Sequence, residues 1–155
     1  MDQITIDSIF KRFDESMPQK YVKKILDARI YDLALETPVE KAPLLSQRFN
    51  NNILLKREDL QPVFSFKVRG AYNKLRCLSD AQRSAGVIAA SAGNHAQGLA
   101  LAAKKMNVNA TIVMPVTTPE IKVDAVRSRG ANVVLIGDNY DAAATHANHL
   151  VQEQG

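Results

Sequence analysis

Four short apolar runs constrain the fold of this chain more than any other feature, because each is followed by a stretch of helical periodicity. The runs cover residues 53–56, 86–90, 110–114 and 132–136. Alternating strands and helices are typical of a parallel sheet with helices on its faces. The run at 86–90 is apolar throughout, which predicts a strand buried on both faces. The sequence therefore predicts an α/β fold with an open parallel sheet of about four strands and helices on both faces.

Capping residues and helix breakers mark where the helices begin. Ser65 is a candidate N-cap for a helix with an apolar stripe from Val68 to Leu78. Ser79 and Gln82 have the spacing of a capping box. Further helices are expected after Asn94, after Thr118-Pro119-Glu120 with its hydroxyl cap, and after a cap at Asp141.

The beginning of the chain has a different character. Residues 1–18 show no clear period, and we expect a loose arm there. From residue 19 to 35 apolar positions recur every three or four residues, which predicts a helix that Pro38 prevents from continuing. We expect residues 1–50 to form a helical N-terminal arm and residues 51–155 to form a small α/β domain.

The carboxyl edge of the predicted sheet is the expected location of a binding site. Ligands bind there in open parallel sheets, because the loops that follow the strands meet at that edge. Two of these loops carry Lys67 and Asn94, which are distant in sequence. The topology therefore predicts that these two residues converge.

Lys67 is the main candidate for chemistry. It lies between Phe66 and Val68 at a predicted helix start, and apolar neighbours that remove water from an ammonium favour the free amine. A free amine is required to form a Schiff base with an aldehyde cofactor. On local composition alone, an ordinary solvated lysine remains an alternative.

Residues 91–98, Ser-Ala-Gly-Asn-His-Ala-Gln-Gly, link an apolar run to a helix. Backbone N–H groups at a helix N-terminus bind anions, and Gly93 allows close approach of a ligand. An ordinary strand-to-helix turn capped by Asn94 is the alternative interpretation.

Three motifs in this order resemble those of pyridoxal-phosphate (PLP) enzymes of the tryptophan-synthase-β class, fold type II. They are Lys-Arg-Glu-Asp-Leu-Gln-Pro (56–62), Ser-Phe-Lys-Val-Arg-Gly-Ala (65–71) and the stretch 91–98. Within that class the chain is most similar to threonine dehydratases (threonine ammonia-lyases), and residues 121–127 resemble their biosynthetic bacterial branch. The resemblance runs from about Tyr21 to the end of the chain. It implies PLP-dependent conversion of L-threonine to 2-oxobutanoate and ammonia, the first step of isoleucine biosynthesis.

The resemblance also implies residue roles. Lys67 matches the lysine that binds PLP covalently and acts as general base. Asn94 matches the asparagine that contacts the 3′-oxygen of the ring. Phe66 matches an aromatic residue that packs against the cofactor, and core packing of Phe66 is the alternative. The residues that match the loop receiving the substrate carboxylate are Ser91, Ala92, Gly93 and His95.

Two further side chains near this edge have structural interpretations. We expect Arg69 to form a salt bridge with Glu58 or Asp59, because these two acids lie just upstream. Tyr140 follows the last predicted strand and is a candidate pocket wall.

The chain departs from the family in its extent. Family members bind the cofactor phosphate with consecutive glycines after the fourth strand, whereas this chain has seven glycines and no two are adjacent. The chain therefore resembles the front third of the enzyme: an arm (1–50) that belongs to the large domain, and the small PLP-binding domain (51–155). The rest of the large domain and the regulatory domain are expected to be absent. We expect weak PLP binding and little activity for this chain alone, and a homo-oligomer for a full-length enzyme.

Composition and charge argue against several classes of partner, and the resemblance implies a small amino-acid substrate, L-threonine or L-serine. The net charge is +4, and the basic residues are spread along the chain, which argues against nucleic acid. A single cysteine, Cys77, and the absence of a Cys/His cluster with zinc spacing argue against a metal site. Neither a signal peptide nor an apolar run of ~20 residues is visible, so we expect a cytoplasmic protein without a membrane anchor.

Two other functions remain open. Serine dehydratases and serine racemases share the lysine and asparagine motifs, and L-serine differs from L-threonine by one methyl group, a discrimination of only ~1–3 kcal/mol. A non-catalytic anion- or nucleotide-binding module is the third interpretation. It is less favoured, because no G-x-G-x-x-G or Walker pattern follows a predicted strand.

Overall fold

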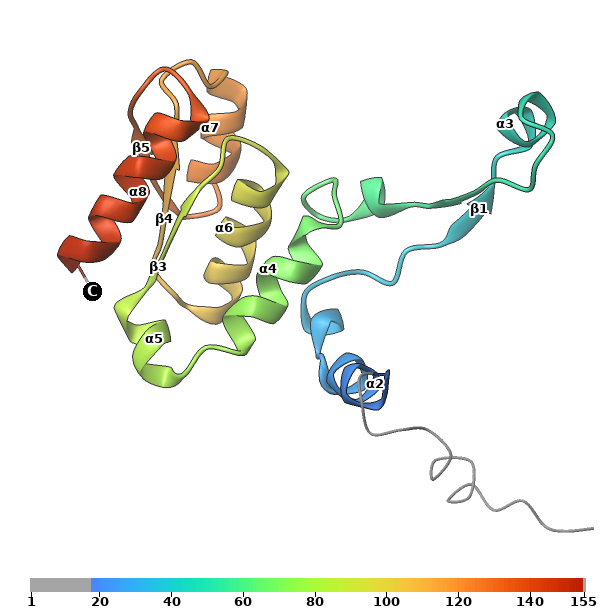
Figure 1. The fold of residues 1–155 in the computed structure, drawn as a ribbon, viewed down its shortest axis with the longest axis horizontal. Coiled ribbons are helices and arrows are strands. Elements are labelled where there is room, and N and C mark those ends of the chain that lie inside the picture. The colour runs from blue at the N-terminus through green and yellow to red at the C-terminus, as the bar shows by residue number, and fades with distance from the viewer. Residues whose placement is uncertain (1–17, 155) are drawn as a thin grey trace, which may run out of the picture.

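The computed structural model describes residues 18–154, which form an α/β unit and an N-terminal segment that projects from it (Figure 1). The N-terminal segment, residues 18–66, contains α2 (Pro18–Asp27), the 3-10 turn η1 (Ile30–Asp32), β1 (Val39–Lys41), α3 (Pro43–Arg48), β2 (Leu54–Lys56) and the 3-10 turn η2 (Glu58–Leu60). The α/β unit, residues 67–154, contains α4 (Lys67–Arg76), α5 (Asp80–Ala85), β3 (Val87–Ala90), α6 (Asn94–Met106), β4 (Ala110–Met114), α7 (Glu120–Arg127), β5 (Asn132–Leu135) and α8 (Tyr140–Gln154).

The sheet of the α/β unit is parallel, in the order β3-β4-β5. Its register pairs Val87 with Ala110 and Thr111 with Asn132. Ile112 and Met114 of β4 pack with α4, α6 and α7, whereas Val113 faces α8. Helices therefore cover both faces of the sheet, and the predicted α/β class with an open parallel sheet is confirmed.

One predicted strand belongs to a different sheet. β2 forms at residues 54–56 but pairs antiparallel with β1, in a separate two-stranded sheet (Figure 1). Residues 39–41 were not predicted as a strand, and the short connection through α3 allows them to pair with β2. The described part of the parallel sheet therefore has three strands where about four were expected.

Burial within the sheet also differs from the prediction. All four residues of β3 are only half-buried, because β3 is an edge strand of the described sheet. The strand that is largely buried is β4, which lies between the other two. The continuous apolar run at residues 86–90 thus predicted a strand correctly, but it did not predict whether that strand lies at the edge or in the centre of the sheet.

The helix starts were predicted with mixed success. The Ser79–Gln82 capping box is present. Ser65 Oγ accepts the backbone N–H of Lys67 at 3.0 Å, but Phe66 occupies the N-cap position of α4, so the prediction of Ser65 as the N-cap is wrong. Asp141 is not the cap of α8, because Asn139 Oδ1 accepts the N–H of Ala142 and the helix begins earlier. Thr118 does not cap α7 either, since its Oγ1 is buried without a hydrogen-bond partner.

The N-terminal predictions are only partly testable. The helix expected over residues 19–35 is interrupted: α2 ends at Asp27, and η1 follows it. The loose arm expected for residues 1–18 lies outside the described residues, apart from Pro18, the first residue of α2. Between residues 18 and 154, no helix is long and apolar enough to cross a bilayer.

Candidate active site

Lys67 lies beside the turn that carries Asn94 and His95, at the carboxyl edge of the sheet, as predicted. The reason differs from the prediction, because β2 is not part of the parallel sheet and the packing of α4 on α6 places Lys67 there. Lys67 is the first residue of α4, and Asn94 is the first residue of α6, directly after the loop that leaves β3. The two helices pack against each other near these ends. A Cβ atom placed on Gly98 of α6 would lie only 3.1 Å from the carbonyl carbon of Lys67.

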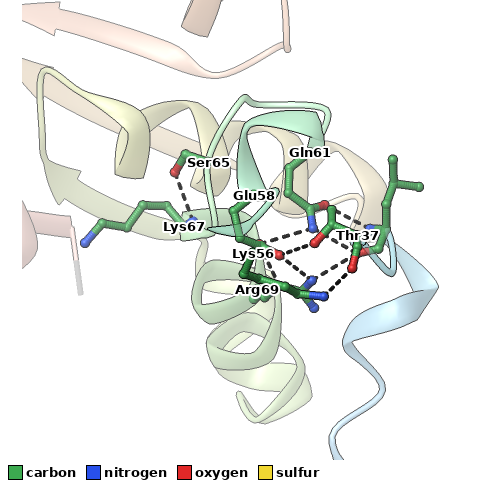
Figure 2. A network of polar contacts seen from close by, with 8 residues as sticks. Thr37, Lys56, Glu58, Gln61, Ser65, Lys67 and Arg69 are labelled. Carbon is green, nitrogen blue, oxygen red and sulfur yellow. Dashed lines mark hydrogen bonds and ion pairs between the residues drawn. The ribbon is translucent and has the colours of Figure 1, made fainter. Parts of the chain in front are cut away.

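The side chain of Lys67 is exposed and points away from the polar network behind it (Figure 2). Its Nζ lies 5.1 Å from the centroid of the Phe66 ring, a distance typical of a cation–π contact. Apolar enclosure of Lys67 was expected from the sequence, but Phe66 is 58% exposed. The reason is local: Val63 and Ser65 take the buried positions, and the aromatic residues that alternate with them face outward. Core packing, the alternative interpretation of Phe66, is therefore wrong.

The loop from Ser91 to Gly93 is fixed by backbone contacts. Ser91 donates its N–H to the carbonyl of Val113 on β4 at 3.0 Å, and all three loop residues are half-buried. Gly93, not Asn94, occupies the N-cap position of α6, and no side chain caps this helix. The interpretation of Asn94 as a simple cap is therefore wrong. The N–H groups in the first turn of α6 have no capping side chain, which is the arrangement that an anion requires.

His95 connects this turn electrostatically to Lys67. Partial burial lowers the pKa of His95 below its ordinary value, and the positive charge of Lys67 lowers it further. Both effects disfavour the imidazolium form of His95.

A polar network anchors the start of α4 from the other side (Figure 2). Arg69 forms a two-pronged ion pair with Glu58, with Nε–Oε2 at 2.8 Å and Nη2–Oε1 at 2.7 Å. The predicted salt bridge of Arg69 is thus confirmed with Glu58, whereas Asp59 pairs with Arg57. The hydrogen bonds from Arg69 are the main reason that the pKa of Glu58 falls to about 2.

Two buried polar residues of this network were not predicted. Gln61 Oε1 accepts the N–H of Leu35 at 2.9 Å, and Gln61 Nε2 donates to the carbonyl of Leu35 at 2.8 Å. Thr37 Oγ1 donates to Glu58 Oε1 at 2.6 Å. Gln61 lies within the motif at 56–62, so its position could have indicated a role, whereas nothing in the sequence around Thr37 does. The network fixes residues 35–37 against the turn that leads to Lys67.

Tyr140 does not join this site. It lies at the start of α8 and lines a shallow pocket with Ala90 and Ala144, on the face of the sheet opposite α4 and α6. Within residues 18–154, no group of three or more metal-binding side chains comes together.

Comparison with known proteins identifies a family and several similar sequences. The family model for "Pyridoxal-phosphate dependent enzyme" matches residues 30–155. "Threonine dehydratase 1 biosynthetic, chloroplastic" from Solanum lycopersicum is 54% identical over 136 residues, which are 88% of this chain and 22% of that protein. "L-threonine dehydratase biosynthetic IlvA" from Burkholderia multivorans is 54% identical over 138 residues, 87% of this chain and 27% of that protein. The chain thus spans about a quarter of the length of these relatives.

Solved structures resemble the whole described fold. The processed form of threonine deaminase isoform 2 from Solanum lycopersicum has a TM-score of 0.86 at 52% identity, covering 92% of this chain and 42% of that chain. Maize serine racemase has a TM-score of 0.80 at 32% identity, covering 86% of this chain and 41% of that chain.

Proposed function

The chain belongs to the family of pyridoxal-phosphate dependent enzymes, and from this membership we propose that it carries the catalytic lysine of a threonine ammonia-lyase. The reaction is the conversion of L-threonine to 2-oxobutanoate and ammonia, in isoleucine biosynthesis. The names of the relatives that are 54% identical over the matched residues support this substrate. One structural observation carries the proposal: the packing of α4 on α6 brings Lys67 and the Asn94–His95 turn together.

The exposed groups at this edge fit the cofactor. Lys67 offers an amine for the aldehyde, and the Phe66 ring beside it offers an apolar face for the pyridine ring. Asn94 is exposed at the start of α6 and offers an amide for the 3′-oxygen. No two glycines of this chain are adjacent, so it has no glycine-rich loop to hold the phosphate, which is why we expect weak binding.

The proposed roles of this chain's residues follow from their positions. Bound PLP withdraws electrons from the substrate and so acidifies its Cα–H bond. Lys67 Nζ holds the cofactor and later takes the proton from the substrate Cα. The N–H groups of the turn formed by Ser91, Ala92, Gly93 and His95 bind the substrate carboxylate and orient the amino acid.

We propose a division of the chain that agrees with these roles. Residues 51–155 form the small PLP-binding domain, and residues 1–50 form an arm of a larger domain. The exposed apolar side chains of α2, β1 and α3 support the assignment of the arm to a larger domain, because a free-standing domain buries such residues. The pairing of β1 with β2 crosses the proposed boundary and joins the arm to the start of the small domain. The further proposals are a cytoplasmic location and a homo-oligomeric full-length enzyme, which cell fractionation and light scattering can test.

A serine-directed PLP enzyme, a serine dehydratase or serine racemase, is the second candidate. The similarity to maize serine racemase favours it, although at 32% identity it is more distant than the threonine deaminase. The two substrates differ by a methyl group, so relative kcat/KM for L-threonine and L-serine distinguishes the two candidates.

A covalent trap tests the proposed role of Lys67. The chain is incubated with PLP and reduced with borohydride, and the pyridoxyl label is mapped by peptide mass spectrometry. We expect more label on Lys67 than on Lys74, an exposed lysine of the same helix, and we expect Lys67→Ala to lose only that label. Equal labelling of both lysines would contradict the role of Lys67.

A chimera tests the reaction and the substrate. In the Burkholderia multivorans relative, the matching residues are replaced by this chain, and kcat/KM is measured for L-threonine and L-serine. We expect 2-oxobutanoate from L-threonine with the higher kcat/KM, and loss of activity in the Lys67→Ala chimera. A preference for L-serine would favour the second candidate instead.

A further inference from the structure

Gly98 is the point at which α6 comes closest to the backbone of α4. A Cβ atom on Gly98 would lie 3.1 Å from the backbone nitrogen of Val68 and 3.2 Å from the carbonyl oxygen of Lys67. These distances are too short for comfortable van der Waals contact, and both atoms belong to the backbone, which cannot rotate away as a side chain can. Only a glycine fits this crossing without displacing α4.

The contact falls on the residue proposed to do the chemistry. Lys67 is the first residue of α4, so Gly98 touches the peptide group directly after it. Gly98 is also one helical turn beyond Asn94, on the same side of α6 and about 6 Å along its axis. A single backbone contact therefore sets the spacing between Lys67 and the turn that carries Asn94 and His95.

Helix propensity alone does not explain a glycine at this position. Gly98 is buried within the long helix α6, where alanine is the better helix former, and buried alanines surround it at Ala96, Ala100 and Ala102. Gly70 of α4 shows the contrast, because a Cβ there meets nothing within 4 Å. The close approach to Lys67 distinguishes Gly98 from Gly70.

We propose that Gly98 is a positioning residue, whose missing side chain sets the distance between Lys67 and the Asn94–His95 turn. This inference rests on the proposed function of Lys67. A methyl group at position 98 pushes the start of α4 away by a few tenths of an ångström. A displacement of 1 Å can lower the rate of a reaction that depends on alignment by about 100-fold. A shift of a few tenths of an ångström should therefore lower the rate of reaction at Lys67 roughly four- to tenfold.

The test compares Gly98→Ala with Gly70→Ala, which makes the same change where there is room. Both variants and the unaltered chain are labelled with PLP and borohydride, and the ratio of label on Lys67 to label on Lys74 is measured. We expect this ratio to fall roughly four- to tenfold in Gly98→Ala and to stay unchanged in Gly70→Ala. An unchanged ratio in Gly98→Ala, with the unaltered chain labelled at Lys67, overturns the role of Gly98 and leaves the proposed function standing.

A second readout does not need the cofactor. Burial and the nearby charge of Lys67 lower the pKa of His95, so a larger separation of the two helices in Gly98→Ala should raise that pKa, measured by NMR titration. No rise, or an equal rise in Gly70→Ala, counts against the inference. If Gly98→Ala loses the circular dichroism of the folded chain while Gly70→Ala keeps it, position 98 is purely structural and the inference is overturned. An unaltered chain without preferential label on Lys67 overturns the proposed function, and this inference falls with it.

Discussion

The α/β unit and the N-terminal segment are held together by different forces. The α/β unit encloses a continuous apolar core, in which Leu75, Ile112 and Val123 are almost completely buried. In the N-terminal segment only a few residues are buried, and most of the large exposed apolar side chains of the described chain belong to it. Its attachment to α4 depends on a small apolar cluster, Ala34, Val63 and Val68, and on the polar network around Glu58.

This difference indicates where the site gains its rigidity. Lys67 lies at the boundary of the two regions, with the packed helix α6 on one side and the Glu58–Arg69 ion pair on the other. The apolar side is insensitive to pH and salt, whereas the polar side depends on the charge of Glu58. Changes in the α/β unit should therefore alter global stability, and changes in the network should alter mainly the N-terminal segment.

Truncation of the core should have the largest effect. Ile112→Ala removes a fully buried side chain from the central strand, and we expect a loss of about 2–5 kcal/mol in the free energy of unfolding. Leu44→Ala is the matched change in α3, where the side chain is 80% exposed, and its effect should stay within about 0.5 kcal/mol. Urea unfolding measures both. Similar losses for the two variants would show that the N-terminal segment is packed as firmly as the unit.

Removal of the charge on Glu58 should have the next largest effect. Glu58→Gln leaves the Arg69 guanidinium, only 19% exposed, without its carboxylate, and we expect a cost of about 1–3 kcal/mol. Hydrogen exchange should rise in residues 35–41 and stay unchanged in β4, because the network joins only the N-terminal segment to α4. Asp59→Asn is the control, since its exposed pair with Arg57 is screened by solvent and contributes little. Faster exchange in β4 would contradict a local role of the network.

Acid should weaken the same attachment without any mutation. The pKa of Glu58 is about 2 in the folded chain and 4.5 without its partners. Because the folded chain binds the Glu58 proton more weakly than the unfolded chain, the ion pair stabilises the folded state fully at pH values above 4.5. This stabilisation is lost as the pH falls from about 4.5 toward 2. We expect the free energy of attachment to fall by about 1–2 kcal/mol, because solvent partly screens this half-buried pair. The protection factors of residues 35–41, which correct for the pH dependence of intrinsic amide exchange, should fall across this range in the unaltered chain and much less in Glu58→Gln.

The two regions also differ in how far their sequence predicts their structure. In the α/β unit, periodicity and caps located every strand and most helix starts, because local pattern and global packing agree there. In the N-terminal segment, residues 54–56 were assigned to the wrong sheet, and residues 39–41 were not recognised as a strand. Three-residue strands with exposed side chains carry no periodic pattern, so only tertiary pairing defines them.

The candidate site was predictable in its location but not in its detail. The rule for parallel sheets correctly placed Asn94 at the carboxyl edge, after β3. It gave the right location for Lys67 for a wrong reason, because β2 belongs to another sheet and the packing of α4 on α6 brings Lys67 to that edge. The buried roles of Gln61 and Thr37, and the crossing at Gly98, depend on distances between segments that are remote in sequence. The exposure of Phe66 could not be predicted either, because the sequence of the motif does not indicate which of its alternating residues face the core.

The smallest expected effect concerns Phe64, where the backbone of the N-terminal segment is strained. Phe64 has a φ of 56°, a conformation that costs an L-residue about 1–2 kcal/mol, and its ring is 74% exposed. Phe64→Gly should relieve this strain and, after the entropy cost of glycine, stabilise the chain by up to about 1 kcal/mol. Phe66→Gly is the control, because Phe66 has an ordinary φ of −62° and no strain to relieve. Thermal unfolding should therefore shift upward for Phe64→Gly and downward for Phe66→Gly. A downward shift for both would mean that the Phe64 ring makes stabilising contacts, and that exposed aromatic residues of the N-terminal segment contribute to its attachment after all.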